Sequence, residues 1–424
     1  MKPLTIVLLL AALFGTVASA QTAPFTCAAI AAVPPTVRAE GLSELTGDVL
    51  LDCTGGVPAA SGSVNFTLFF NTNVTSRILD TGTQACEALL LVDEPQPGTT
   101  PLTPGQNLYQ GVCSGNRIDV LGVQVVPPGN SGHRIYRFTN ARVNASAIPP
   151  TGGGPGTIQS LISATGSISV PINVPTQVVG YTQFGLSNPK TYTIGVNGSL
   201  NQGIGLNSTV LLTQTLSFSE GIPTAFRRNN AGTTPSDPTA VQQQNMPGAI
   251  YNTESGFFDT SLTAAGGLNQ AGRATQGTRF FAKFDNVPTG VDVWVTAGPL
   301  PGGSVASSDA RLMVTDQNGS GAWFPMPNSR YMPVTLYGSG TPVNLVKLAE
   351  ITNGTGVAVW EVLKDNPIGA DSFSFGLLLS YSSQSSSSFN ITTRLAPLSA
   401  SATADSTSPV PRFSNSAINY PAGT

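Results

Sequence analysis

The chain holds few side chains suited to acid–base or nucleophilic chemistry. His133 is the only histidine, and a Ser-His-Asp triad would have to use it, because no other side-chain type here normally titrates near neutral pH. The G-x-S-x-G elbow, the H-E-x-x-H zinc motif and the phosphate-binding glycine motifs are absent. His133 follows Gly132 at the start of a predicted strand, in a turn-rich segment. We interpret it as an exposed residue and expect no catalytic histidine.

Acidic side chains are the remaining route to catalysis, because a glycosidase needs only two carboxyl groups at the right separation. Three groups of acids flank predicted turns: Glu87 with Asp93 and Glu94, Asp285 with Asp292, and Glu361 with Asp365. Acids at such positions usually solvate strand ends and turns. The sequence therefore favours a non-catalytic protein, with a carboxylate-dependent polysaccharide hydrolase as the alternative.

One segment is similar to the start of a calcium-binding loop. Asp316, Asn318 and Ser320 supply side-chain oxygens at alternate positions. The position that should carry a bidentate glutamate is Pro327, and only one of the three ligands is charged, so calcium affinity would be weak. The same residues suit an Asn-Gly hairpin turn, which we prefer. No metal and no cofactor are expected.

Aromatic residues supply the best candidate for binding. Trp323, Phe324, Arg330 and Tyr331 lie in a proline-containing segment that also holds Met326. Rigid rings beside polar groups suit stacking on a sugar or contact with a protein, because they bury area at a small cost in conformational entropy. The competing interpretation turns Trp323 and Phe324 inward, to close one end of a β-sandwich.

The N-terminal residues predict export. Lys2, the apolar stretch 4–14 and the small residues at 18–20 form a signal-peptide pattern, so residues 1–20 are expected to be removed. The apolar stretch is too short to span a membrane, and no span is expected in the mature chain. The expected location is outside the cell or on its surface, with the periplasm as an alternative.

Four cysteines fall in the first third of the chain: Cys27, Cys53, Cys86 and Cys113. An even number in an exported chain predicts two disulfides. Sequential pairing, the first with the second and the third with the fourth, is preferred because each pair brackets a plausible hairpin. The two other pairings stay open.

The composition excludes some partners and suits an exposed protein. Charged residues make up 10% of the chain, against roughly 25% in ordinary soluble domains. Hydrophobic residues make up 40%, enough for real cores, and the formal net charge is −3 without any basic stripe. Binding to a phosphate backbone therefore has no electrostatic support, and nucleic acid is not expected as a partner.

Alternation of apolar and polar residues predicts an all-β protein, since no amphipathic helix longer than two turns is evident. Short strands separated by Gly, Pro, Asn and Asp turns are typical of antiparallel sandwiches. The expected strands are 36–40, 48–53, 64–71, 88–92, 117–126, 134–143, 167–173, 191–196, 209–219, 279–284, 291–296, 310–315, 343–351, 357–363, 373–381 and 389–395.

The length of the mature chain predicts two or three domains. We expect a disulfide-containing sandwich at 21–186 and a second sandwich region at 187–396. The polar stretch 227–277 is expected to be an irregular insertion, and the serine-rich residues 382–388 a loop between the last two strands. Residues 397–424 are expected to form a flexible tail. Residues 134–140 and 279–286 are similar to each other, which favours duplication.

Passages at 37–42, 48–56, 89–95 and 410–413 carry a family resemblance. On these passages the chain resembles uncharacterised secreted bacterial proteins built from immunoglobulin-like β-sandwich domains. The resemblance implies two or three antiparallel immunoglobulin-like sandwiches behind a cleaved signal peptide, and it implies no activity.

Together these patterns predict a secreted, non-catalytic structural or adhesive protein. Its expected partners are an extracellular glycan, a surface protein or further copies of itself. The alternatives are the polysaccharide hydrolase and a self-assembling filament or coat subunit joined through the C-terminal tail by strand addition.

Overall fold

The computed structural model describes residues 23–94, 100–152, 154–187, 189–301, 309–321, 325–348, 351 and 353–416. Strands dominate this part of the chain, which confirms the expected all-β class. Its helical turns are α2 (Val241–Gln244), η2 (Ala145–Ala147), η3 (Ala265–Gln270) and η4 (Asn328–Arg330). Of the described helices, none is long and apolar enough to cross a membrane. The predicted signal peptide, 1–20, lies outside the described residues.

The first unit is one continuous sheet with the strand order β13-β1-β4-β10-β7-β8-β9-β5-β12-β14-β2. It curls, so that the side chain of Gln177 in β14 hydrogen-bonds the main chain of Ala29 and Ala31 in β1. The strands are β1 (Thr26–Ala31), β2 (Thr36–Arg38), β4 (Val49–Gly55), β5 (Gly62–Phe70), β6 (Ile78–Asp80), β7 (Ala85–Val92), β8 (Leu108–Ser114), β9 (Arg117–Val125), β10 (Gly129–Thr139), β12 (Gly156–Gly166), β13 (Ile172–Asn173) and β14 (Thr176–Gln183).

This pairing differs from the expected antiparallel immunoglobulin-like sandwich. The outermost pairs, β13 with β1 and β14 with β2, are parallel, so the sheet is mixed. Alternate residues of each strand face the inside of the curl: in β5, Val64, Phe66, Leu68 and Phe70 are buried and the residues between them are not. One curled sheet thus encloses its own core, and an immunoglobulin-like sandwich is not confirmed.

Both disulfides lie inside this unit and follow the preferred sequential pairing. Cys27 and Cys53 are directly opposite each other on β1 and β4. Cys86 and Cys113 join the neighbouring strands β7 and β8. All four are buried, and their presence indicates an oxidising compartment outside the cytoplasm.

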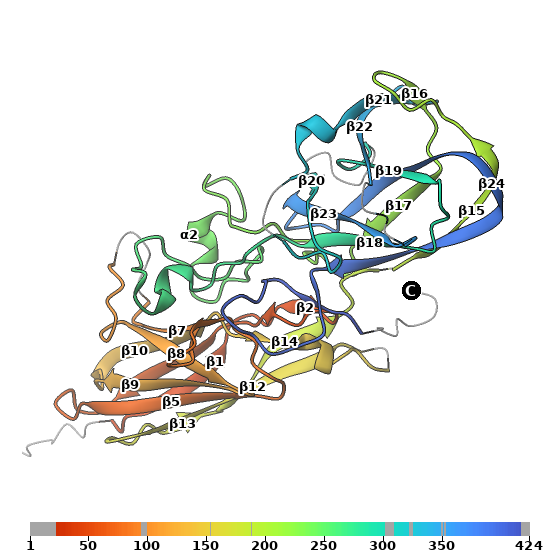
Figure 1. Ribbon diagram of the computed structural model, residues 1–424. Coiled ribbons are helices and arrows are strands. Elements are labelled where there is room, and N and C mark those ends of the chain that lie inside the picture. The colour runs from red at the N-terminus through yellow and green to blue at the C-terminus, as the bar shows by residue number, and fades with distance from the viewer. Residues whose placement is uncertain are drawn as a thin grey trace, which may run out of the picture.

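The second unit is organised around one long strand, β24 (Ser372–Ala396). Its first part pairs with β17 and β19, and its last part pairs with β15 and β18. The other strands extend these two layers (Figure 1). They are β15 (Thr191–Leu200), β16 (Thr209–Val210), β17 (Gln214–Ser219), β18 (Arg279–Asp285), β19 (Asp292–Thr296), β20 (Asp309–Leu312), β21 (Met332–Leu336), β22 (Pro342–Lys347) and β23 (Gly356–Lys364).

The prediction of a loop at 382–388 is wrong, because strand β24 continues through these residues. Ser387 pairs with Val196, and Gln384 pairs with Gly198. Both layers contribute to one aromatic core, in which the rings of Trp360 and Phe375 stack with centroids 4.2 Å apart. The long strand therefore joins the layers through their backbone, and the core joins them through side chains.

The polar stretch 227–277 is irregular, as expected, but it is firmly packed. Its apolar residues, among them Tyr251 and Phe257, bury against Leu89 and Leu91 on the outer face of β7. Figure 1 shows this green segment lying over the orange strands of the first unit. The stretch therefore covers the outside of the curled sheet.

Residues 397–416, expected to begin a flexible tail, instead cross the place where the two units meet. β25 (Leu398–Ser399) and β26 (Phe413–Ser414) pair with each other. Leu42 donates its N–H to the carbonyl oxygen of Arg412 at 2.9 Å, and the side chain of Phe413 is buried. Alongside, β3 (Glu44–Leu45) pairs with β11 (Arg142–Val143). Residues 417–424 lie outside the described part.

Candidate binding site

Each acid singled out from the sequence lies beside a cation. Pairing of this kind occupies the carboxylate with a protein partner. The pairs are Glu87–Arg142 at 3.0 Å, Asp93–Arg134 at 3.4 Å, Glu94–Arg137 at 3.5 Å, Asp285–Lys283 at 2.8 Å, Asp292–Lys347 at 2.7 Å, Glu361–Arg279 at 2.9 Å and Asp365–Arg228 at 2.6 Å. The structure therefore brings these acids to arginines and lysines.

Glu220 is the acid that sequence reasoning missed. Its two carboxylate oxygens accept the N–H groups of Phe226 at 2.6 Å and of Asp371 at 2.7 Å. Burial raises the pKa of Glu220 to about 7, although both hydrogen bonds act the other way. Burial likewise raises the pKa of Asp365 to about 6, against the effect of Arg228. Because main-chain groups cover both oxygens of Glu220, we interpret it as a structural group that ties two turns together.

His133 lies on β10 and contacts Asp52 of the neighbouring strand β4. The distance from its Nδ1 to Oδ1 of Asp52 is 2.9 Å, and the two side chains are 63% and 30% exposed. A pair this open to water is unlike the buried, oriented histidine that a catalytic triad requires.

The calcium-like segment forms a self-contained turn. Oδ1 of Asp316 accepts the N–H groups of Asn318 at 2.8 Å and Ser320 at 2.9 Å. Gly319 has a φ of 77°, which suits glycine. In the part of the chain that the structure describes, no cluster of three or more His, Cys, Asp or Glu could hold a metal ion. The carboxylate that would bind calcium thus already holds the turn.

The aromatic segment is only partly visible, because Trp323 and Phe324 lie outside the described residues. Arg330 is exposed, and its Nη1 is 3.5 Å from the sulfur of Met326. Tyr331 is half-buried and packs, like Met326, against the core of the second unit. Of the two predicted binding residues that the structure describes, Arg330 and Tyr331, it is Tyr331 that packs against the core.

Tyr331 lines a groove of about 440 Å³, which we call the Tyr331 groove. Ligand sites typically measure about 300–1,000 Å³ and combine apolar walls with a few polar groups. Prolines and an exposed ion pair, Asp309 with Arg311 at 3.8 Å, also line the groove. The lining residues with most to offer a ligand are Thr296, Pro299, Asp309, Arg311, Tyr331 and Asn344. This groove is our candidate binding site.

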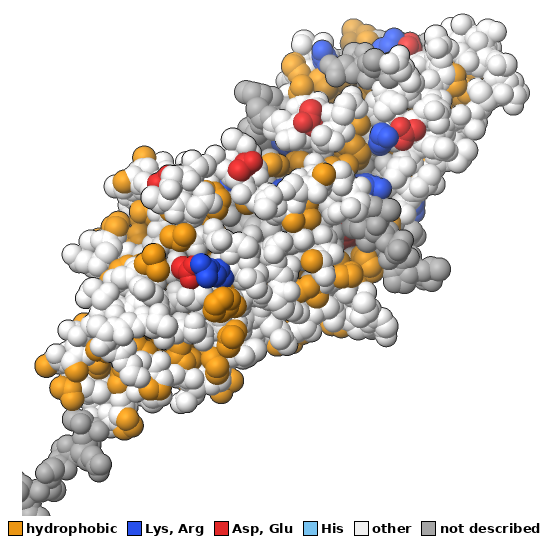
Figure 2. Space-filling model, turned by 60° about the horizontal axis from the view of Figure 1, so that its bottom comes forward, with side chains coloured by type: hydrophobic (Ala, Val, Ile, Leu, Met, Phe, Trp, Pro, Cys, Tyr) orange, Lys and Arg blue, Asp and Glu red, His pale blue; other side chains and the backbone are white. Residues whose placement is uncertain are grey.

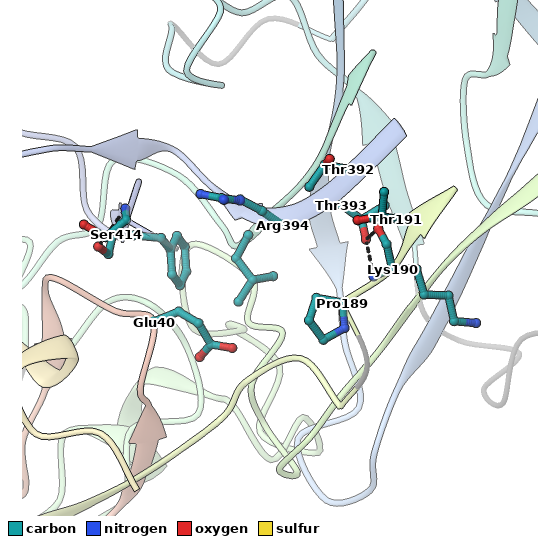
Figure 3. A pocket seen from close by; sticks show the side chains of 11 residues that line it. Glu40, Pro189, Lys190, Thr191, Thr392, Thr393, Arg394 and Ser414 are labelled. Atoms are coloured by element: carbon teal, nitrogen blue, oxygen red, sulfur yellow. Dashed lines mark hydrogen bonds between the residues drawn. The ribbon is translucent and has the colours of Figure 1, made fainter. Parts of the chain in front are cut away.

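Two other hollows offer less. A crevice of about 180 Å³ lies where Glu40, β15, β24 and residues 413–416 meet, and Figure 3 shows the Arg394 side chain extending toward Ser414 across it. The carboxylate of Glu40 already accepts N–H groups of Gly185 and Leu186. A third hollow, of about 610 Å³, lies between residues 286–292 and 347–354 and is lined by polar and aliphatic side chains. Among these three hollows, the Tyr331 groove alone combines a partly exposed aromatic ring with polar groups.

The visible surface is poor in charge. Figure 2 shows isolated Lys, Arg, Asp and Glu side chains among uncharged ones. A large share of the chain's few charged residues is buried, namely Arg38, Glu40, Glu44, Asp48, Arg77, Glu87, Arg137, Arg142, Glu220, Arg227, Glu254, Asp259, Arg279, Glu361, Asp365, Asp371 and Arg412. Hydroxyl and amide groups therefore make up much of the polar surface.

Comparison with known proteins gives little. No family model matches the chain, and no curated protein matches it. A DUF4466 family protein from Parabacteroides merdae is 8% identical over 84% of this chain and 98% of its own, with a TM-score of 0.22. The pilus backbone RrgB from Streptococcus pneumoniae is 10% identical over 84% of this chain and 88% of its own, with a TM-score of 0.23. Scores this low carry no argument about fold or function.

Proposed function

We propose that the protein is a non-catalytic structural or adhesive protein that binds a neutral carbohydrate outside the cytoplasm through the Tyr331 groove. The observation that carries this proposal is the ring of Tyr331, which packs against the core and also lines a groove of about 440 Å³.

The chemistry of the groove suits a sugar. An aromatic ring stacks on the apolar face of a pyranose, and hydroxyl groups need donors and acceptors nearby. Asn344 offers an amide, while Asp309 and Arg311 offer an acceptor and a donor. Because packing already holds Tyr331, little side-chain entropy remains to be lost on binding.

The absence of catalysis is supported by the state of the acids. A general acid or base must come within hydrogen-bond reach of its substrate. The acids flagged from the sequence contact arginines or lysines, and several of them, such as Glu87 and Glu361, are buried. These ion pairs support a structural role for the carboxylates concerned.

We also propose that the protein is secreted and that it is related to secreted bacterial proteins with immunoglobulin-like domains. Secretion is supported by the leader-like residues 1–20 together with two disulfides. Membership among secreted bacterial proteins with immunoglobulin-like domains is supported only by the two layers around β24, since the first unit is a single curled sheet.

A glycan-binding measurement tests the proposal. The full chain, expressed with its own leader, is applied to a glycan array and sedimented with insoluble polysaccharides. Loss of a stacked ring removes about 1.5 kcal/mol, which is roughly tenfold in affinity, so Tyr331→Ala should bind at least about tenfold more weakly. Tyr331→Phe should retain binding.

Tyr337→Ala is the matched control, since Tyr337 is 72% exposed and does not line the groove. Equal loss in both alanine variants, or no glycan bound by the folded wild type, would contradict the proposal. Release of reducing sugar ends by the wild type would favour the hydrolase instead.

A further inference from the structure

Three arginines and one glutamate are buried where residues 397–416 pack against the first unit. Arg142 places its Nε 3.0 Å from Oε1 of Glu87, and Arg77 donates its main-chain N–H to the same oxygen at 3.0 Å. The main chain of Arg412 meets them at Ser43: its main-chain N–H donates to the Ser43 hydroxyl at 3.1 Å, while Nη1 of Arg142 donates to the Ser43 carbonyl oxygen at 3.2 Å. All three guanidinium-bearing residues and Glu87 are buried.

The charges in this cluster do not balance. Within the described residues, Arg142 has the carboxylate of Glu87, but neither Arg77 nor Arg412 forms an ion pair. The Arg77 guanidinium donates to main-chain oxygens of Gln270 and Arg273. Neutral carbonyl oxygens satisfy hydrogen bonds but do not neutralise charge, and a buried charge without a counter-charge is strongly unfavourable.

Arg412 is the least satisfied of the three. The two hydrogen bonds that its guanidinium donates, to the carbonyl oxygens of Pro409 and Ala402, are long at 3.4 and 3.3 Å. Its Nε donates no hydrogen bond to any described residue, and neither does Nε of Arg77 or Nε of Arg142, although the last is 3.0 Å from Oε1 of Glu87. Oε2 of Glu87 accepts no hydrogen bond from the described residues. Buried polar atoms without partners are rare in folded proteins and call for an explanation.

The surroundings of Arg412 also disfavour its positive charge. Burial lowers the pKa of Arg412 to about 10; Glu87 opposes this, and Arg142 adds to it. The acid Asp405 also favours the charged form of Arg412, but Asp405 itself lies in an exposed turn. At neutral pH Arg412 is therefore still a cation, held in a place that disfavours cations.

We propose that this cluster binds a small monovalent inorganic anion, with chloride as the common occupant, next to the guanidinium groups of Arg412 and Arg142. A halide accepts N–H donors from several directions, and it supplies charge that a water molecule would not. Since Arg412 belongs to residues 397–416 and the other two arginines to the first unit, the bound anion fastens one to the other.

Thermal unfolding in matched salts tests this site. The full chain is unfolded in sodium chloride and in sodium gluconate of equal ionic strength. A site in the folded state makes the melting temperature rise with chloride and then follow mass action. Arg412→Met should lose the chloride-dependent rise, while Arg117→Met, at a side chain that is 50% exposed, should keep it. A rise that is the same in gluconate, or the same in both variants, overturns the proposal.

Anomalous scattering from bound bromide tests the anion site in the wild-type protein, so this test does not depend on whether Arg412→Met folds. Crystals grown in sodium bromide should show an anomalous peak within hydrogen-bond reach of Arg412. Peaks confined to exposed arginines and lysines, or no peak at all, overturn the proposal.

Discussion

The guanidinium of Arg38 lies against the carboxylate of Glu254, with Nη1 2.6 Å from Oε1, although 216 positions separate the two residues. Arg38 also pairs with Glu44 at 2.7 Å, and Thr278 donates its hydroxyl to Glu254 at 2.6 Å. Burial alone would raise the pKa of Glu254, but Arg38 outweighs it and the pKa is lowered. This contact fastens the stretch 227–277 to the first unit.

Removing one partner of that pair should be costly. Glu254→Gln leaves a buried guanidinium short of one counter-charge, so the free energy of unfolding should fall by about 3–5 kcal/mol. Replacing all three members of the group, Arg38→Met with Glu44→Gln and Glu254→Leu, should lose less, because no member then keeps an unpaired charge. Urea unfolding measures both.

The exposed pair of Arg117 with Asp119 serves as the control for this prediction. Arg117→Gln should change the free energy of unfolding by less than about 1 kcal/mol, because water screens exposed pairs. An equal loss in Glu254→Gln and Arg117→Gln would show that the buried pair has no special role.

Stability should fall as the pH rises through neutrality because of Glu220. Its pKa is about 7 in the folded protein against an ordinary value of 4.5, so between these values the folded state holds a proton that the unfolded chain has released. The contribution is complete at low pH and is lost as the pH rises, by roughly 3 kcal/mol at most. Urea unfolding from pH 5 to pH 8 measures the slope.

Glu220→Gln should flatten that slope, whatever its effect on absolute stability. Asp405→Asn, at an exposed acid whose pKa is already lowered by Thr407, should leave the slope unchanged. If the slope is identical in the two variants, another group causes it.

Phe413 should contribute to the stability of the folded protein, because it contacts residues of both units. Its ring is buried in the core of the second unit, and the guanidinium of Arg38 lies 4.8 Å from its centroid. Phe413→Ala should therefore lower the free energy of unfolding by about 3–5 kcal/mol. Ile368→Ala, at a side chain that is 79% exposed, should have little effect. Similar urea midpoints for the two variants would mean that residues 397–416 contribute little.

The disulfides should be confined to the first unit. Peptide mapping without reduction should recover Cys27 with Cys53 and Cys86 with Cys113. Replacing Cys86 and Cys113 together by Ser should lower the free energy of unfolding by about 2–4 kcal/mol, since the bridge closes a loop in the unfolded chain. A peptide that links Cys27 to Cys86 would contradict the fold.

Local alternation predicted some strands, missed others such as β12 (Gly156–Gly166) and β14 (Thr176–Gln183), and failed where pairing alone creates a strand. Residues 64–71 alternate apolar and polar side chains, and β5 (Gly62–Phe70) forms there. Residues 382–388 are mostly serine and have no alternation, yet they are extended because β15, nearly two hundred positions earlier, pairs with them. Curling of the first sheet also depends on such distant pairing, which the resemblance to sandwich proteins could not supply.

The sequence predicted only part of the candidate site, because several of its contacts join residues that are far apart in the chain. Tyr331 stands out in the sequence as a ring in a constrained segment, and the fold places it in a groove. The acids could not be judged locally, because the cation beside Glu361 comes from 82 positions earlier and the one beside Asp365 from 137. Nothing near Glu220 in the sequence marks it as buried.

The contact between Ser43 and Arg412, 369 positions apart, has a consequence for biogenesis. A ribosome makes the strands of the first unit long before it makes residues 397–416, which pack against that unit at Leu42 and Ser43. In that interval the nascent chain leaves this surface uncovered, and transiently exposed surface makes a chain prone to aggregation. Closure of a contact between residues so far apart in the sequence is expected to be slow.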